Sequence, residues 1–287
     1  MLEVKNGPST SSGRTDVKDA LRIATTRLTA TSDTPRLDAE LLMAHVLGVT
    51  RSDLLLRHLR DPSPAAFDAL VERRAAHEPV AYITGEAEFY GRTFRVTPAT
   101  LVPRADSETL IRAALELAPE SHRVLDLGTG SGALLLTFLA ETRASGTGID
   151  ASAAACGAAA ENAARLDLHQ RTTILHRSWI ESGWQDDLGT FDLILCNPPY
   201  VEEGADLAPD VRDYEPATAL FAGAEGLNDY RLLVPQLRAL MNPQAVAIFE
   251  IGATQADAVA SIAQRHGFAA QLRRDLAGRP RALVLQE

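Results

Sequence analysis

From residue 124 onward, apolar stretches of strand length alternate with stretches of helical periodicity. The strand candidates cover residues 124–127, 146–150, 172–175, 191–196, 245–250, 269–272 and 282–285. Such alternation is typical of an open, mostly parallel sheet with helices on its faces. Ligands of these sheets bind beyond the carboxyl ends of the strands. The pattern therefore predicts a Rossmann-like α/β domain with seven strands, and it directs the search for a site to the turns after those strands.

The first third of the chain has a different periodicity. Apolar residues recur at helical spacing between residues 17 and 71, which predicts a small helical bundle. Gly48 is placed to end the second helix, and Ser63 followed by Pro64 is placed to open the last one. No catalytic constellation is evident in this part.

From Pro79 the apolar period changes to two. The stretches 80–83, 88–90 and 93–96, with Gly91 between the last two, predict a β-hairpin connector. We therefore expect four parts in the chain. They are a disordered N-terminus (1–14), a helical domain (15–78), a β-hairpin linker (79–105) and the sheet domain (106–287).

Composition excludes several classes of protein. With a net charge of −10 over 287 residues, the chain does not suit a protein that holds DNA by neutralising phosphates. The two cysteines, Cys156 and Cys196, have neither zinc-site spacing nor a disulfide framework, and we expect no metal. No apolar run has transmembrane length, and the N-terminus lacks the apolar core of a signal peptide. We expect a cytoplasmic monomer that binds neither DNA nor a membrane.

The tetrapeptide Asn197-Pro198-Pro199-Tyr200 follows the apolar stretch 191–196. Because prolines have no N–H to donate, this turn cannot extend a sheet, but it can hold acceptors in fixed positions. The Asn197 side-chain oxygen and the Pro198 carbonyl suit the two hydrogens of a planar NH2 group, on which Tyr200 could stack. This grip favours a tetrahedral nitrogen whose lone pair faces an electrophile. We expect the turn to bind substrate, with Asn197, Pro198 and Tyr200 catalytic.

A plain proline-rich turn is the alternative, so the hypothesis needs a cofactor site nearby. Gly128, Gly130 and Gly132 directly follow the first strand of the sheet domain. In the dinucleotide fingerprint the third glycine would fall on Ala133, so this spacing favours a wide turn against an amino-acid moiety. Asp150 ends the next strand, where a carboxylate can accept both hydroxyls of a ribose. These features predict a nucleoside-containing cofactor, with a generic nucleotide site as the alternative.

The sheet domain resembles a class I S-adenosylmethionine-dependent methyltransferase. The chain from about Thr15 to its end is similar to the release-factor glutamine N5-methyltransferases. The motifs that carry this resemblance are EPVAYITG (78–85), EFY (88–90), LVPRADSE (101–108), DLGTGSG (126–132), NPPY (197–200), YEP (214–216), AL (219–220), GL (226–227) and DLAGR (275–279). The motifs that precede the sheet domain separate this family from other enzymes with the same tetrapeptide.

The resemblance implies transfer of a methyl group from S-adenosyl-L-methionine to the side-chain amide nitrogen (N5) of the glutamine in the GGQ motif of peptide-chain release factors. It also implies a role for each site residue. Asp150 would contact the cofactor's ribose, Trp179 would lie beside the adenine, and Asn197 would link cofactor and substrate. The helical domain and the hairpin would dock the release factor. The methionine part of the cofactor would contact Gly128, Thr129, Gly130, Ser131 and Gly132.

Two positions depart from the family pattern. Ala105 replaces the second proline of the usual Pro-Arg-Pro-Asp, which affects local rigidity. Ser178 stands where the family often has an acidic residue that is available to the adenine amino group. The manner in which the adenine is held is therefore open at the level of the sequence.

Two other functions compete with this one. A nucleic-acid adenine N6-methyltransferase could grip an exocyclic amine in the same way, but it must also flip a base and hold a backbone, which the acidic composition disfavours. A non-catalytic binding subunit would be expected to lose Asn197 or the glycines, and this chain keeps both. A dehydrogenase is disfavoured by the glycine spacing.

Overall fold

The computed structural model describes residues 15–287, so the predicted disorder of residues 1–14 lies outside the described part. The chain forms two compact units that divide between Thr84 and Gly85. Among the described residues, no helix combines the length and the apolar character needed to cross a bilayer.

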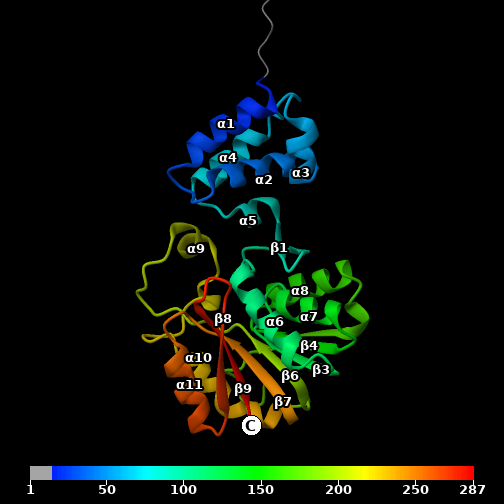
Figure 1. The fold of residues 1–287 in the computed structure, drawn as a ribbon, viewed down its shortest axis with the longest axis vertical. Helices are drawn as coiled ribbons and strands as arrows, with labels where there is room; N and C mark the ends of the chain where they lie inside the picture. Colours follow the sequence, from blue (N-terminus) through cyan, green and yellow to red (C-terminus); the bar gives the residue numbers. More distant parts are fainter. Residues whose placement is uncertain (1–14) are drawn as a thin grey trace, which may run out of the picture. The chain divides into compact units, whose positions relative to one another are not determined.

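The first unit is a helical bundle around its own apolar core (Figure 1). Its elements are α1 (Val17–Leu28), α2 (Pro35–Leu47), α3 (Arg51–Asp53) continued by a π-helical turn (Leu54–His58), α4 (Phe67–Ala75) and α5 (Val80–Thr84). As expected, Gly48 ends α2 in a left-handed conformation, at φ 66°. Within this unit Asp38 and Arg74, each less than a tenth exposed, form a buried ion pair at 2.7 Å.

Two sequence predictions for this unit are wrong. The stretch 80–83 is not extended but forms helix α5, where the amides of Tyr82 and Ile83 both donate to the carbonyl of Pro79. A proline that precedes a first turn has no N–H to leave unpaired, so it favours a helix start over a strand. Helix α4 begins at Phe67 and not directly after Ser63.

The second unit begins with the predicted hairpin, strands β1 (Glu86–Phe89) and β2 (Arg92–Arg95). Its two loop residues, Tyr90 and Gly91, both have positive φ, at 52° and 71°. A two-residue loop of this kind matches the twist of antiparallel strands. The predicted hairpin is therefore confirmed, with strands at 86–89 and 92–95 in place of the expected 88–90 and 93–96.

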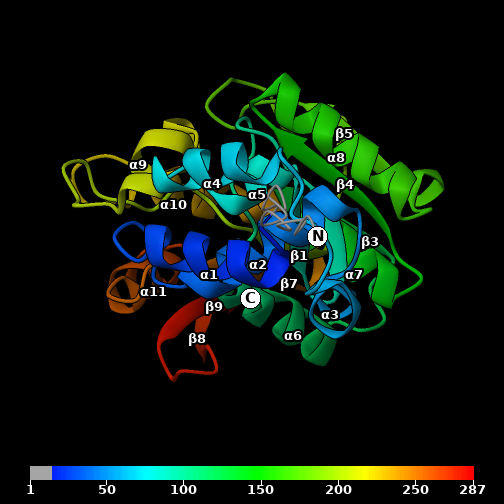
Figure 2. The same ribbon diagram turned by 90° about the horizontal axis from the view of Figure 1, so that it is seen from above.

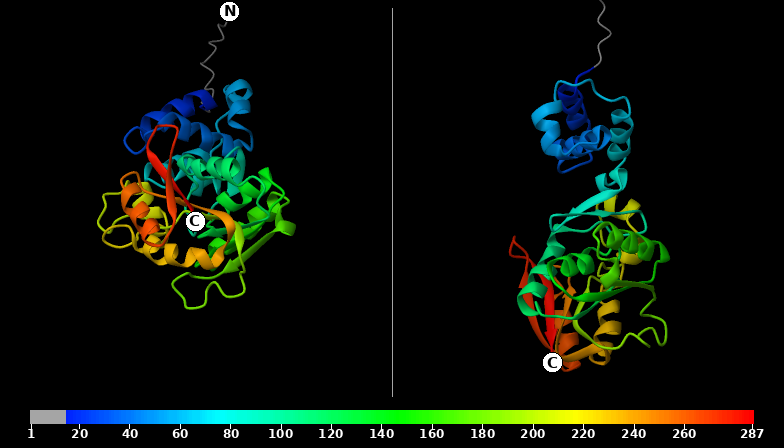
Figure 3. Two further views of the ribbon diagram at one scale, coloured as in Figure 1. Left: turned by 60° about the horizontal axis from the view of Figure 1, so that its bottom comes forward. Right: turned by 90° about the vertical axis from the view of Figure 1, so that its right-hand side faces the viewer.

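The main body is a seven-stranded sheet in the order β5-β4-β3-β6-β7-β9-β8. Strands β3 to β7 pair in parallel, and β9 pairs antiparallel with both β7 and β8. Figure 3 draws the last two strands in red. The fold class predicted from the alternation is confirmed. The strands are β3 (Arg123–Leu127), β4 (Ser145–Asp150), β5 (Thr172–His176), β6 (Phe191–Cys196), β7 (Met241–Glu250), β8 (Ala269–Arg274) and β9 (Pro280–Gln286).

Helices cover both faces of this sheet because successive residues of its buried strands point to opposite sides. Leu193 and Leu195 of β6 belong to one apolar cluster, and Ile194 and Cys196 belong to the other. One cluster includes α6 and α7, and the other includes α10 and α11 (Figure 1). Helix α8 lies along β4 and β5 (Figure 2). The helices are α6 (Glu108–Leu117), α7 (Ala133–Glu141), α8 (Ala153–Arg165), α9 (Pro209–Tyr214), α10 (Asn228–Leu233) and α11 (Ala256–Arg265).

The predicted helix from 228 to 241 is shorter than expected. Helix α10 ends at Leu233, and the chain continues as a 3-10 helix (Val234–Leu240) that contains Pro235. A proline at this position cannot donate an α-helical hydrogen bond, which explains the change of helix type. Strand β7 then begins at Met241, earlier than the predicted start at Ala245.

Asn162 joins the hairpin to the main sheet of the second unit. Its side chain on α8 is 1% exposed, accepts the amide of Arg95 at 2.8 Å, and donates to the carbonyls of Arg95 and Ser131 at 2.9 Å each. A buried amide side chain thus pairs backbone groups of β2 and of the loop before α7. Such groups are costly to leave unpaired.

We expect Asn162→Ala to lower the free energy of unfolding by about 3 kcal/mol, because several backbone groups lose their buried partner at once. Glu161→Ala is the matched control. Glu161 is the adjacent residue on α8, and its ion pair with Arg95 is exposed, so the loss should stay below about 1 kcal/mol. Urea unfolding of both variants measures the difference, and equal losses would contradict the role given to Asn162.

Candidate functional site

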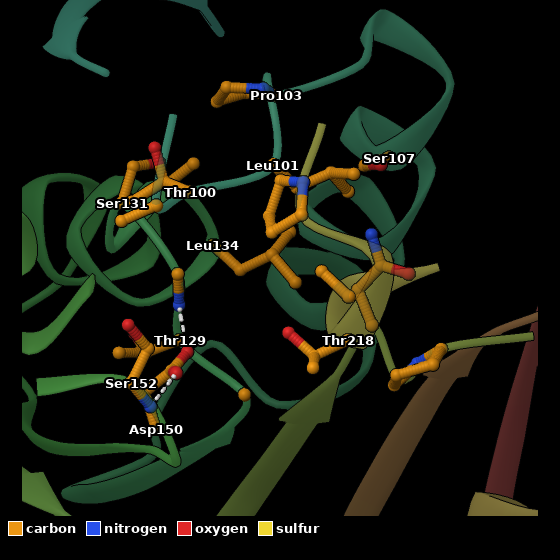
Figure 4. A pocket seen from close by; sticks show the side chains of 18 of the residues that line it. Thr100, Leu101, Pro103, Ser107, Thr129, Ser131, Leu134, Asp150, Ser152 and Thr218 are labelled. Atoms are coloured by element: carbon orange, nitrogen blue, oxygen red, sulfur yellow. Dashed lines mark hydrogen bonds between the residues drawn. The ribbon is translucent and has the colours of Figure 1, made fainter. Parts of the chain in front are cut away.

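Strands β3 and β6 are neighbours in the centre of the sheet, and both run in the same direction. The chain leaves β3 toward β4 on one side and leaves β6 toward β7 on the other. Because the two connections diverge, a crevice opens at the carboxyl ends of these strands. A cavity lies there, lined by the loop after β3, the end of β4 and the turn after β6 (Figure 4).

The loop after β3 contains the predicted glycines. Gly128, Thr129, Gly130 and Ser131 line the cavity, whereas Gly132 does not line it and instead precedes the first residue of α7. The amides of Gly128 and Thr129 both donate to the carbonyl of Ile149 at 2.9 Å, which fixes the loop to the neighbouring strand.

Asp150 ends β4 and lines the same cavity. One carboxylate oxygen accepts the amide of Gly130 at 2.9 Å, and the other accepts the amide of Ser152 at 2.8 Å (dashed lines in Figure 4). A carboxylate has about four lone-pair positions, so two acceptor positions remain after these bonds. Asp150 therefore organises the glycine loop and still carries acceptors.

Asp126 lies under this loop and is 1% exposed. Its carboxylate accepts the hydroxyl of Thr129 at 2.7 Å. Burial raises the pKa of Asp126 to about 7, and the Thr129 hydrogen bond opposes that rise. The buried carboxylate of Asp126 thus fixes the side chain of Thr129, the second residue of the glycine loop.

Trp179 follows β5 and lines the cavity next to the glycine loop. A β-carbon added to Gly128 would lie 3.1 Å from the six-membered part of the indole, so only glycine lets the ring approach the loop this closely. The indole N–H donates to Asp229 of α10 at 2.8 Å. Ser178 is not among the lining residues.

The structure separates the four residues of the turn after β6. Asn197 and Pro199 line the cavity, whereas Pro198, which is buried, and Tyr200, which is half-buried, are outside the lining. The Tyr200 hydroxyl donates to the carboxylate of Glu250 at 3.3 Å. The stacking role expected of Tyr200 stays a prediction.

Contacts beyond the turn fix its position. The side-chain amide of Gln255 donates to the carbonyl of Tyr200 at 2.9 Å and to that of Gly226 at 3.2 Å, and its oxygen accepts the amide of Gly252 at 3.0 Å. A β-carbon on Gly226 would lie 2.2 Å from the Tyr200 oxygen, so this close approach requires glycine. These contacts fix the backbone carbonyl of Tyr200 at the end of the turn.

Glu250, at the end of β7, is the other support of Tyr200. It is 1% exposed, and burial raises its pKa to about 7. The neighbouring hydroxyl of Tyr230 donates to the Glu250 backbone carbonyl at 2.7 Å.

Sequence reasoning gave no role to two further segments of the lining. One runs from Ala99 to Ser107 before α6, and the other includes Pro216, Thr218 and Ala219. An ion pair between Arg104 and the buried Glu215 at 2.5 Å ties these segments together. Both lie in stretches that carried the family resemblance, so the signal was present without an assigned role.

The lining suits S-adenosylmethionine by its chemistry. The space beside Gly130, where an added β-carbon would meet nothing within 4 Å, leaves room against the loop, and the Asp150 carboxylate offers acceptors of the kind that pair with ribose hydroxyls. Trp179 contributes an aromatic surface on the same side. All three come from the ends of adjacent parallel strands, where such ligands bind.

Comparison with known proteins supports one family. Residues 19–85 match the model of the PrmC N-terminal domain, and residues 105–215 match that of the methyltransferase small domain. The release factor glutamine methyltransferase of Cereibacter sphaeroides is 43% identical over 92% of this chain and 95% of its own length. The protein of the same name from Nitratidesulfovibrio vulgaris is 38% identical over 93% of this chain and 94% of its own.

Solved structures agree on the fold. A methyltransferase from Pyrococcus furiosus superposes with a TM-score of 0.50 at 16% identity, over 76% of this chain and 96% of that one. The identity over nearly the full length of the curated relatives is well beyond what a shared fold alone requires. This chain belongs to the release factor glutamine methyltransferase family.

Proposed function

We propose that this protein methylates the side-chain amide nitrogen (N5) of the glutamine in the GGQ motif of a peptide-chain release factor, with S-adenosyl-L-methionine as the methyl donor. One observation carries the proposal. The glycine loop, Asp150, Trp179 and the turn with Asn197 all meet in one cavity at the switch point of the sheet. The names of the curated relatives supply the substrate class.

In this proposal the cofactor is held by residues that line the cavity. The loop from Gly128 to Ser131 takes the methionine part, Asp150 takes the ribose hydroxyls, and Trp179 takes the adenine. Gly132 contributes indirectly, because it turns the loop into α7 with φ at 82°, a conformation that residues with a β-carbon rarely adopt. When bound, the cofactor supplies an electrophilic methyl group on a positively charged sulfur.

The turn after β6 holds the nucleophile. The Asn197 side chain, which lines the cavity, accepts one amide hydrogen with its oxygen. The backbone carbonyl of Pro198 accepts the other, while the Pro198 ring stays outside the lining, and the grip favours a tetrahedral nitrogen with its lone pair free to react. Because alkylation makes the nitrogen acidic, its proton leaves without a strong base. Positioning therefore supplies most of the rate. The hydrogen bonds from Gln255 to Tyr200 and Gly226 support this role, since a grip of this kind needs a rigid turn.

We also propose that the helical unit and the hairpin dock the release factor, with the protein acting as a cytoplasmic monomer. The direct test uses purified protein, S-adenosylmethionine and a release factor. Mass spectrometry should find one added methyl group on the GGQ glutamine, and a release factor with that glutamine changed to alanine should stay unmodified. Methylation of DNA or RNA adenine with no change in the release factor would support the rival function.

We expect Asp150→Ala to weaken S-adenosylmethionine binding by about 1.5–3 kcal/mol, because charge-assisted hydrogen bonds to the ribose are lost. Asp150 also accepts the Gly130 amide, so the glycine loop loosens as well. Isothermal titration calorimetry measures the affinity. Asp257→Ala, at an exposed position of α11, is the control for the change in charge. Unchanged affinity in the Asp150 variant would remove this residue from the site.

Asn197→Ala should mainly affect turnover. We expect single-turnover methylation of a release factor to slow on the order of 100-fold, with a much smaller change in cofactor affinity, because the lost contact strengthens as the nitrogen becomes tetrahedral. Rapid-quench kinetics and calorimetry on one protein preparation separate the two quantities. A normal methylation rate would show that the proposed grip on the amide is wrong.

A further inference from the structure

The indole of Trp179 is held by a residue far away in the sequence. Its N–H donates to the Asp229 carboxylate at 2.8 Å, although 50 positions separate the two residues. Trp179 lies in the loop after β5, and Asp229 lies in the first turn of α10. Both side chains are partly buried, so the bond is shielded from competition with bulk water.

The opposite edge of the same ring is fixed as well. The six-membered part of the indole lies against Gly128, where a β-carbon would come within 3.1 Å of it. The ring is therefore restrained at its N–H edge by a hydrogen bond and at its far edge by the glycine loop. Trp179 lines the cavity together with Asp150 and Ser152.

The position of Asp229 is fixed by its neighbour in the helix. The adjacent residue on α10, Tyr230, is fully buried and donates its hydroxyl to the carbonyl of Glu250 at 2.7 Å. Burial raises the pKa of Asp229, while the hydrogen bond from Trp179 opposes that rise by favouring the charged form. Asp229 does not line the cavity, so it can act on a ligand only through the indole.

We propose that Asp229 is a positioning residue that fixes the plane of the Trp179 indole, on which the adenine of the cofactor stacks. The inference rests on the proposed function, because it assumes that the cavity takes S-adenosylmethionine. It also accounts for the missing acidic residue at Ser178. Here a carboxylate contributes to adenine binding by orienting an aromatic ring and not by contacting the amino group.

The physical basis is preorganisation. A tryptophan side chain that must be ordered on binding costs conformational entropy, and this cost is subtracted from the affinity. Stacking also requires that the face of the ring lie parallel to the base. A ring that is held at both edges before the ligand arrives meets both conditions.

The test compares variants of the full chain by calorimetry with S-adenosylhomocysteine and with 5′-methylthioadenosine. Asp229→Leu removes the acceptor and should weaken the binding of both ligands about tenfold. This loss corresponds to part of the energy of an aromatic–base stack. The loss should be equal for the two ligands because both carry the adenine, while only one carries the amino-acid part. Asp229→Asn keeps an acceptor oxygen and should bind within about threefold of the native protein. Asp229→Ala repeats the deletion without added bulk, in case the leucine variant does not fold.

The chain provides a matched control. Its other tryptophan, Trp184, donates its N–H to Gln236 at 2.8 Å but does not line the cavity. Gln236→Leu removes the same kind of bond, and it should lower the melting temperature without changing either affinity. A comparable loss of ligand affinity in this control would show that the Asp229 effect is a general loss of stability.

Further outcomes would overturn the inference. One is that Asp229→Leu and Asp229→Ala bind both ligands as tightly as the native protein does, while Trp179→Ala binds them weakly. Another is that Asp229→Asn binds them as weakly as Asp229→Leu and Asp229→Ala do. Normal binding by Trp179→Ala would reject stacking on the indole altogether. Failure of the native protein to bind S-adenosylhomocysteine would instead reject the proposed function together with this inference. Each failure therefore has its own pattern.

Discussion

The site depends on one constraint of the sheet, the divergence of the chain after β3 and β6. These strands are adjacent and parallel at the centre of the sheet, so the loops after them begin side by side and then separate. The glycine loop and the turn with Asn197 can share a cavity only because of this arrangement. Asp150 joins them because β4 is the next strand on one side.

A common device stiffens the loops of this cavity. Asp150 accepts the Gly130 amide of the glycine loop, Asn162 donates to the Ser131 carbonyl of that loop, and Gln255 donates to the Tyr200 carbonyl at the end of the turn after β6. In each case a side chain in a regular element, or directly before one as Gln255 is before α11, pairs with the backbone of a loop. Loops are otherwise the mobile parts of a fold, and a reaction that relies on positioning cannot tolerate that mobility.

Local features of the site could be predicted from the sequence, and distant contacts could not. The glycines directly follow one strand of the pattern and Asp150 ends the next, so each can be recognised from its immediate neighbours in the sequence. Asp229 and Gln255 act on residues about 50 positions away, where no pattern of spacing reports the contact. The error at 80–83 has the opposite cause. Helix α5 has only five residues, too few to show a helical period, so its apolar residues were interpreted as a strand. The signal for a helix was local, because Pro79 directly precedes its first turn.

The separation in sequence between the turn after β6 and the residues that hold it also has a consequence for biosynthesis. The turn ends at Tyr200, yet the groups that hold it are Glu250 and Gln255, and β9, which pairs with the end of β7, is the last strand of the chain. A ribosome releases the chain from its N-terminus onward, and domains fold in that order. The helical unit can therefore fold early in translation, whereas the turn acquires its final shape only after Glu250 and Gln255 have been synthesised and have folded onto it.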